Sequence, residues 1–198
     1  TLNHLDTVYV IGTFCGCSNY TDSAVFTVNT SPTTTLICDD IDAIICSQTL
    51  VNFTASGANL YEFFVDGVSQ GAPATSPIFS TSSLTNNQTV SVTGESNTCT
   101  VSQSIQFSVL PSPSVGFFSN DPNNSICEGE TITFTCANAD QYELFVNGNS
   151  QGAPQNNSIF TPNLPNGIDS LYIIGTALNG CTDTSQSIIV TVTPLPSI

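Results

Sequence analysis

The 198-residue sequence contains no lysine and no arginine. Its 15 Asp and Glu residues give a formal net charge of −15 at pH 7, with His4 as the one histidine. Proteins bind nucleic acid and anionic lipid by neutralising phosphate with Lys and Arg, so we expect neither partner here. Conventional salt bridges are excluded as well, which leaves packing, hydrogen bonds and disulfides to stabilise the fold.

Long apolar runs and zinc motifs are also lacking. No segment reaches the roughly 18 consecutive apolar residues that indicate a membrane-spanning helix, so we expect no membrane insertion. There is no C-x-x-C pair, and a single histidine argues against a zinc site. The chain does contain eight cysteines among many Ser, Thr and Asn residues. Such cysteines form disulfides in oxidising surroundings, so the composition predicts an extracellular or cell-surface protein.

What the sequence does contain is an internal repeat. Residues 46–73 (CSQTLVNFTASGANLYEFFVDGVSQGAP) match residues 127–154 (CEGETITFTCANADQYELFVNGNSQGAP) without a gap, and the offset, 127 − 46, is 81 residues. A period of this length indicates one structural unit that recurs along the chain. We predict one repeat over residues 33–113 and another over residues 114–198.

Residues 1–32 match only the second half of a repeat. The segment DTVYVIGT at 6–13 aligns with DSLYIIGT at 169–176, and Cys17 aligns with Cys181. Two explanations are open: the chain is a window on a longer array, or the half-repeat is donated to the sandwich of another molecule. We favour the array, because donation needs a repeat without its last strands and both later repeats look complete.

The hydrophobic pattern is that of β-strands throughout. Ile132, Phe134 and Cys136 alternate with threonines, and the dipeptides Asp66-Gly67 and Asn147-Gly148 suit the positive φ angles of tight hairpin turns. Several short strands per repeat, with no helical period, are typical of a sandwich. We therefore predict an all-β fold of tandem immunoglobulin-like β-sandwich repeats, joined by short proline-containing connections and stapled by disulfides.

Two cysteines recur in each repeat and are predicted to pair within it. Cys46 and Cys99 recur as Cys127 and Cys181, which gives the pairs Cys46–Cys99 and Cys127–Cys181. Each pair would close a loop of about 50 residues and contribute on the order of 4 kcal/mol.

The remaining cysteines have no complete set of counterparts. Cys17 corresponds to Cys181, so its partner is expected upstream. Cys136 is in phase with buried residues, which indicates a buried free thiol. Cys15 and Cys38 are candidates for an additional disulfide that would clip the first domain to the second, although spacing alone does not fix connectivity.

Acidic residues gather where each complete repeat begins. Carboxylate and amide oxygens are ligands for calcium, and a divalent cation would be a natural counter-ion in a chain without Lys or Arg. The alternative is a solvated turn, since Asp and Asn favour turns. We expect no other cofactor. The candidate ligands are Asp39, Asp40, Asp42 and Asp121.

The candidates for catalysis are weak. His4 and Asp6 are the one His–carboxylate proximity in the sequence, and they lie in the incomplete repeat. Glu62 and Glu143 could suggest glycoside hydrolysis, but in a strand they would face solvent, opposite the side chains of the core. We predict that the chain is not an enzyme.

The motif Y-E-[FL]-F-V-[DN]-G-x-x-Q-G at 61–71 and 142–152, with NGCT at 179–182, resembles the tandem Ig-like repeats of large secreted proteins of Bacteroidota. The resemblance implies a cell-surface adhesin, gliding-associated protein or filament, often exported by the type IX route. It also implies O-glycosylation at Asp-Ser/Thr-apolar triplets. The candidate acceptors are Thr7, Ser23 and Ser170.

The sequence thus predicts a non-enzymatic structural or adhesive repeat region, forming part of an extracellular stalk, fibre or filament. Its expected partners are neighbouring repeats or copies of itself. The alternative is an accessory carbohydrate-binding module of a large secreted enzyme, with surface glycans as partners. Saturable glycan binding would favour the second function, and elongated arrays without a ligand would favour the first.

Overall fold

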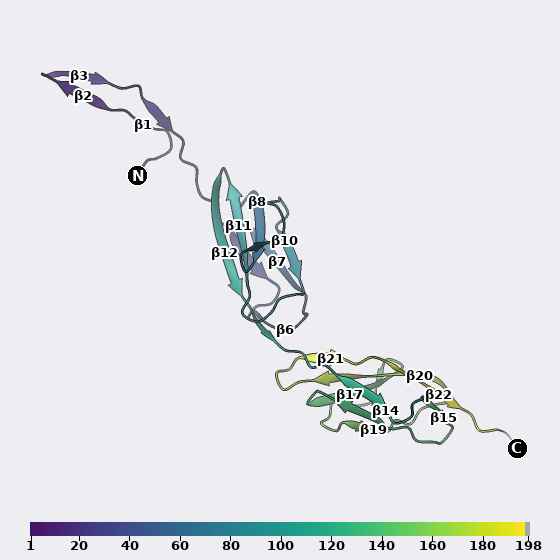
Figure 1. Ribbon diagram of the computed structural model, residues 1–198. Helices are drawn as coiled ribbons and strands as arrows, with labels where there is room; N and C mark the ends of the chain where they lie inside the picture. Colours follow the sequence, from purple (N-terminus) through teal and green to yellow (C-terminus); the bar gives the residue numbers. More distant parts are fainter. Residues whose placement is uncertain (197–198) are drawn as a thin grey trace. The chain divides into compact units, whose positions relative to one another are not determined.

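The computed structural model describes residues 1–196, and the regular structure of this range consists of β-strands (Figure 1). The predicted all-β sandwich class is thereby confirmed. No helix long and apolar enough to cross a membrane occurs in the described range. The chain divides into two compact units, the first built from Thr1–Ala43 with Leu50–Ser108 and the second from Ile44–Thr49 with the residues from Val109 onward.

The first 28 residues, here called the arm, form two antiparallel strand pairs. In the outer register Asp6 lies opposite Phe26 and Val8 opposite Ala24. In the inner register Gly12 lies opposite Asn19. The paired strands are β1 (Asp6–Val8) with β4 (Ala24–Phe26), and β2 (Ile11–Phe14) with β3 (Cys17–Tyr20).

The rest of the first unit consists of two sheets. One has the strand order β10-β7-β5 and the other β12-β11-β8-β9, with antiparallel neighbours throughout. The bounds are β5 (Thr35–Cys38), β7 (Val51–Ser56), β8 (Leu60–Val65), β9 (Val68–Ser69), β10 (Ile78–Thr81), β11 (Thr89–Ser96) and β12 (Cys99–Gln106).

The core of the first unit follows from strict alternation along these strands. In β7 the side chains of Val51, Phe53 and Ala55 are buried, while the residues between them are exposed. Phe53 packs edge-on against Phe107 with ring centroids 5.6 Å apart, and Phe63 of β8 stacks on Phe79 of β10 at 5.4 Å. The two sheets therefore share one aromatic core, as expected for a sandwich.

The second unit repeats this plan with an additional strand pair. Its sheets have the orders β14-β16-β19 and β15-β22-β20-β17-β18, with β21 also pairing β20, and β13 pairs β6. The bounds are β6 (Ile44–Cys46), β13 (Ser108–Leu110), β14 (Gly116–Ser119), β15 (Ser125–Cys127), β16 (Phe134–Ala137), β17 (Gln141–Val146), β18 (Asn149–Ser150), β19 (Ile159–Phe160), β20 (Gly167–Thr176), β21 (Thr182–Thr184) and β22 (Ile188–Thr193).

The core of the second unit combines side chains from both of its larger sheets, among them Phe134, Leu144, Ile173 and Val190. A glycine in the central strand β20 permits the closest approach. A Cβ atom added to Gly175 would lie 2.5 Å from Cγ2 of Val115 and 2.8 Å from Cβ of Ala139. Glycine is needed here because neighbouring side chains fill the space that a larger residue would occupy.

The repeated motif forms a hairpin in each unit. Asp66-Gly67 and Asn147-Gly148 have positive φ angles of 47°, 77°, 51° and 78°, as the turn prediction requires. Behind each turn a serine hydroxyl donates a hydrogen bond to the motif glutamate, Ser69 to Glu62 at 2.7 Å and Ser150 to Glu143 at 2.5 Å. The motif therefore specifies a turn and the clamp that holds its two strands together.

Candidate functional site

The most informative site is the disulfide between Cys46 and Cys181, with Cα atoms 5.6 Å apart. Cys46 ends β6, and Cys181 is fully buried just before β21. Both residues belong to the second unit, because Ile44–Thr49 folds with the residues from Val109 onward. By sequence, however, they come from successive repeats. The bond thus joins the two sequence repeats within one structural unit.

The predicted pairings Cys46–Cys99 and Cys127–Cys181 are corrected by this bond. Cys99 and Cys127 are free thiols in the structure. Cys127 lies opposite Thr193 of β22, next to the beginning of β20, whereas Cys181 precedes the strand that pairs with the end of β20. These positions are separated by the length of a 10-residue strand, roughly 30 Å. A disulfide spans at most about 7 Å between Cα atoms, so the pair cannot form.

The loop that carries Cys181 is fixed by its own hydrogen bonds. The Gly180 amide donates to the Ala177 carbonyl and the Ala177 amide to the Cys181 carbonyl, each at 2.9 Å. The Asn179 side chain accepts from the Cys181 amide at 3.0 Å and donates to the Pro111 carbonyl at 2.9 Å. The sulfur of Cys181 is therefore held in place by a closed turn.

The segment that carries Cys46 is held just as closely. The Ser47 amide donates to the Leu110 carbonyl at 2.8 Å, and the Ser112 amide donates to Oγ of Ser47 at 3.1 Å. The pairing of β6 with β13 thus positions Cys46, while the turn at Asn179 positions Cys181. Its chemical role is that of a covalent staple. Because the cysteines are 135 residues apart in sequence, the closed loop contributes about 5 kcal/mol in the chain-entropy model.

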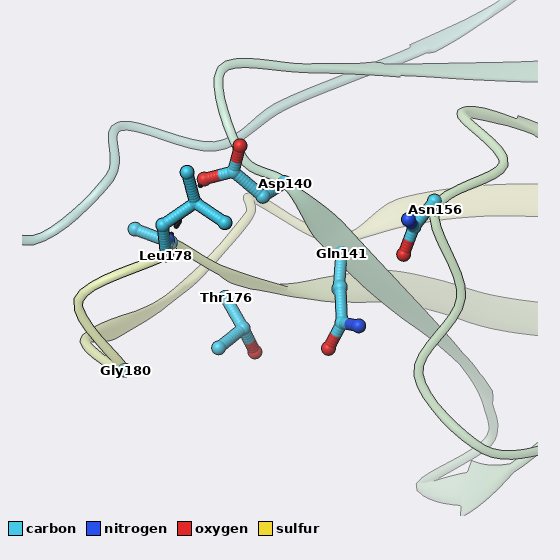
Figure 2. A pocket seen from close by; sticks show the side chains of 7 residues that line it. Asp140, Gln141, Asn156, Thr176, Leu178 and Gly180 are labelled. Atoms are coloured by element: carbon cyan, nitrogen blue, oxygen red, sulfur yellow. Dashed lines mark hydrogen bonds between the residues drawn. The ribbon is translucent and has the colours of Figure 1, made fainter.

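Two hollows flank this loop. The first, of about 420 Å³, is lined by Asp140, Gln141, Asn156, Thr176, Ala177, Leu178 and Gly180. In Figure 2, Asp140 lies beside Leu178, whose amide donates to the Asp140 carboxylate at 2.9 Å. The second, of about 400 Å³, is lined by Ser47, Gln48, Ser112, Pro113, Ser114, Thr182 and Asp183. Neither set of lining residues contains a histidine, a cysteine or an aromatic ring.

This composition limits what the hollows can do. A hydrolytic site needs a nucleophile, a base and a group that orients the base. Each lining set has one carboxylate that could act as a base, and both accept backbone hydrogen bonds, Asp140 from the Leu178 amide at 2.9 Å and Asp183 from the Val115 amide at 3.4 Å. Ligand pockets are commonly lined by aromatic as well as apolar side chains, and neither lining set contains an aromatic ring. The Asp140 carboxylate is already used to hold the loop. Both carboxylates thus hold backbone segments beside the disulfide.

The four predicted calcium ligands are divided between the two units, with Asp39, Asp40 and Asp42 in the first and Asp121 in the second. Asp39 accepts hydrogen bonds from the Asn52 amide at 3.0 Å and the Asn52 side chain at 2.7 Å. These two hydrogen bonds hold the pKa of Asp39 below its ordinary value, and the bond from the Asn52 backbone amide has the larger effect. Asp121 lies in the second unit, where it accepts from the amides of Asn123 and Ser125. Asp42 is exposed, and Asp40 has one buried carboxylate oxygen without a hydrogen bond.

No group of three or more His, Cys, Asp or Glu side chains that could hold an ion occurs within residues 1–196. Asp39 and Asp121 both act in turns or at strand ends, which corresponds to the alternative of a solvated turn. Calcium binding remains a prediction without a geometric site.

The additional disulfide predicted between Cys15 and Cys38 is absent from the described chain, where both are free thiols. The Cys38 thiol donates to the Asp40 carbonyl at 2.8 Å, and its pKa is raised, first by burial. Cys15 is exposed and has a φ of 49° in the turn between β2 and β3. Cys38 thus bonds within its own segment, and Cys15 lies in a tight turn.

The other predicted site residues are accessible to different degrees. Thr7 and Ser23 are exposed in the arm, and Ser170 is half-buried in β20, so glycosylation at these positions remains a prediction. His4 is exposed ahead of β1, while Asp6 accepts a hydrogen bond from the Asn3 amide at 2.6 Å.

Comparison with known proteins concerns the fold. No protein-family model and no curated protein matches the sequence. Among solved structures, the fibronectin(III)-like modules of Clostridium thermocellum CbhA match with a TM-score of 0.41 and 12% identity, covering 81% of this chain and 95% of that one. A 1.5-MDa bacterial ice-binding adhesin matches with a TM-score of 0.34 and 13% identity, covering 84% of this chain and 66% of the other. The function has to be inferred from this chain's own residues.

Proposed function

We propose that this chain is a non-enzymatic structural and adhesive repeat region of an extracellular stalk, fibre or filament. The observation that carries the proposal is the Cys46–Cys181 disulfide, which links successive sequence repeats. A bond of this kind requires oxidising surroundings. An extracellular location also suits a chain without Lys or Arg, because proteases that cut after these residues find no site.

The disulfide gives the chain a mechanical property. When the two ends are pulled, tension passes directly from Cys46 to Cys181 through the covalent bond. The residues between them, which include strands β7 to β20, are bypassed and carry no tension. They would add about 450 Å to the extended chain if the bond were broken, at 3.3–3.6 Å per residue. A connected array of such units would resist extension without depending on the stability of each sandwich.

Peptide mapping of the oxidised chain without reductant tests this proposal. Cleavage after glutamate separates Cys46 (fragment 1–62), Cys99 and Cys127 (fragment 96–128) and Cys181 (fragment 144–198). We expect fragments 1–62 and 144–198 to be recovered as one crosslinked species, with fragment 96–128 in neither crosslink. A product in which 96–128 joins both of the others would show that each repeat is stapled separately, and the linked-array proposal would be wrong.

The carbohydrate-binding alternative makes a different prediction. It requires saturable binding of a glycan by the intact chain. The two hollows beside Cys181 lack the aromatic rings on which a sugar could pack. We therefore expect no saturable glycan binding at these two hollows. Binding that is lost in an Asn156→Ala variant would favour the accessory-module function instead.

A further inference from the structure

The arm exposes an unusual amount of apolar surface. Its exposed large side chains include Leu5, Val8, Tyr9, Val10, Ile11, Phe14, Tyr20, Val25, Phe26 and Val28. Soluble monomers seldom expose apolar side chains in one contiguous group, and such groups mark interaction sites. Two strand pairs on their own are also marginally stable in water. The arm therefore needs a partner that covers it.

The second unit shows which kind of partner fits. The pairing Asp6↔Phe26 in the arm corresponds to Asp169↔Val190 in β20 and β22, and Gly12↔Asn19 corresponds to Gly175↔Asp183 in β20 and β21. The arm thus reproduces, in the same register, the second half of the second unit. In that unit the partner of this half is the segment that contains β14 to β19.

Burial at equivalent positions shows which face the partner covers. Val8 and Val10 are 42% and 63% exposed, whereas their counterparts Leu171 and Ile173 are both 0% exposed. On the other strand Phe26 is 42% exposed and its counterpart Val190 is 0% exposed. Val8, Val10 and Phe26 are thus apolar residues at positions that are buried in the second unit but exposed in the arm.

Gly12 supplies an independent observation. Its counterpart Gly175 is a glycine because Val115 and Ala139 pack against it, but nothing lies within 4 Å of a Cβ atom added to Gly12. The backbone of Gly12 does not have a positive φ either. A glycine inside a strand weakens that strand. Its presence in open space is explained when a partner brings a side chain such as Val115 against it.

Asp6 adds a requirement on the partner's chemistry. Its counterpart Asp169 is buried and accepts a hydrogen bond from the Asn147 side chain at 2.7 Å. The first unit has Asp66 at the position equivalent to Asn147. If a half-repeat like that of the first unit were the partner, its aspartate would face the carboxylate of Asp6. Two facing carboxylates repel each other, and the chain has no Lys or Arg to neutralise them. The partner should therefore carry asparagine at this turn.

We propose that the arm is a docking surface for the first half of a repeat of the kind formed by residues 114–166, with asparagine at its hairpin turn. The partner strand equivalent to β17 pairs along Val8–Thr13 as β17 pairs along β20, and the partner sheet equivalent to β14-β16-β19 covers Val8, Val10 and Phe26. The inference deepens the proposed function, since it names the surface through which this chain joins a further repeat.

The test uses the full oxidised chain and a synthetic polypeptide of residues 114–166 with Cys127→Ser and Cys136→Ala to prevent disulfide exchange. We expect a 1:1 complex by native mass spectrometry, with slowed amide hydrogen exchange at Val8–Thr13. Val10→Asp should weaken binding at least about 100-fold, since it buries a charge. Its matched control Ile11→Asp should bind normally, because the counterpart Ile174 is half-buried on the other face. Both positions are exposed in the free chain.

A second probe separates specific docking from general stickiness. A polypeptide of residues 33–85, with Cys38 and Cys46 replaced by serine, has Asp66 in place of Asn147 and should bind at least about 10-fold more weakly. Asp66→Asn in this probe should recover the loss. Absence of a complex, equal effects of Val10→Asp and Ile11→Asp, or arm-to-arm dimers that form without any probe would each overturn the proposal. None of these results would alter the Cys46–Cys181 peptide map, so the two proposals fail separately.

Discussion

Individual residues of the repeated motif form hydrogen bonds within their own hairpins. Glu62 and Glu143 resemble paired catalytic carboxylates in sequence, yet each accepts a hydrogen bond from a serine seven residues later. Tyr61 donates its hydroxyl hydrogen to the Ala58 carbonyl at 2.8 Å and thereby closes the bend before β8. These polar atoms thus form hydrogen bonds within their own hairpins.

Cys136 provides a test of burial in the second unit. Its side chain is 4% exposed, and burial raises the pKa of the thiol to about 11. We expect iodoacetamide at pH 8 to modify Cys15 and Cys17 quickly in the native chain and Cys136 only after unfolding. Because the unfolded thiol ionises near pH 9 and the folded one does not, this group also favours unfolding as the pH rises above about 9. Rapid native alkylation of Cys136 would show that the core is open.

The Asp39–Asn52 contact gives a prediction on acid titration. The pKa of Asp39 is lowered first by the Asn52 backbone amide and then by its side chain. Asn52→Ala removes only the second donor, so the pKa should rise but stay below its ordinary value, as measured by NMR titration. A group with a lowered folded pKa stabilises the fold above about pH 4 and loses this effect as the pH falls through the folded pKa. An unchanged pKa in Asn52→Ala would contradict the contact.

The strands and turns could be predicted from the sequence. The assignment of the segment Ile44–Thr49 to the second unit could not. Alternation in residues such as Ile132 and Phe134, and the Asn-Gly and Asp-Gly turns, act locally, so sequence alone predicts them. The segment Ile44–Thr49 belongs by repeat register to residues 33–113, but it folds with the second unit. Hydrophobic alternation predicts a strand there without showing which sheet accepts it.

Matched glycine substitutions test the packing of equivalent strands. Gly175→Ala places a Cβ atom 2.5 Å from Val115, so we expect a loss of about 1–3 kcal/mol in the free energy of unfolding of the second unit. Gly12→Ala meets no atom within 4 Å and should change stability by less than about 0.5 kcal/mol in the isolated chain. Urea denaturation followed by tyrosine fluorescence measures both. Equal effects would mean that the arm is already covered.

For the whole molecule, the sequence predicted the class of fold and the presence of disulfides, but not their connectivity. Each repeat has the same two cysteines, so pairing within a repeat and pairing between repeats leave the same pattern of spacings. The choice depends on which ends of the strands meet in space. Cys127 and Cys181 lie at opposite ends of β20, while Cys46 is brought to Cys181 by the strand pair of β6 and β13. Calcium binding at the entry of each repeat stays a prediction, since Asp39 and Asp121 lie in different units and each accepts hydrogen bonds from its own local segment.

Single-molecule stretching of the chain from its two ends, with and without reductant, tests the central claim most directly. With the Cys46–Cys181 bond intact, only the residues before Cys46 and after Cys181 can extend, roughly 210 Å in all. Reduction should release about 450 Å more as β7 to β20 unfold. If the oxidised and reduced chains extend to the same length, no bond bypasses these strands and the covalently linked array is wrong.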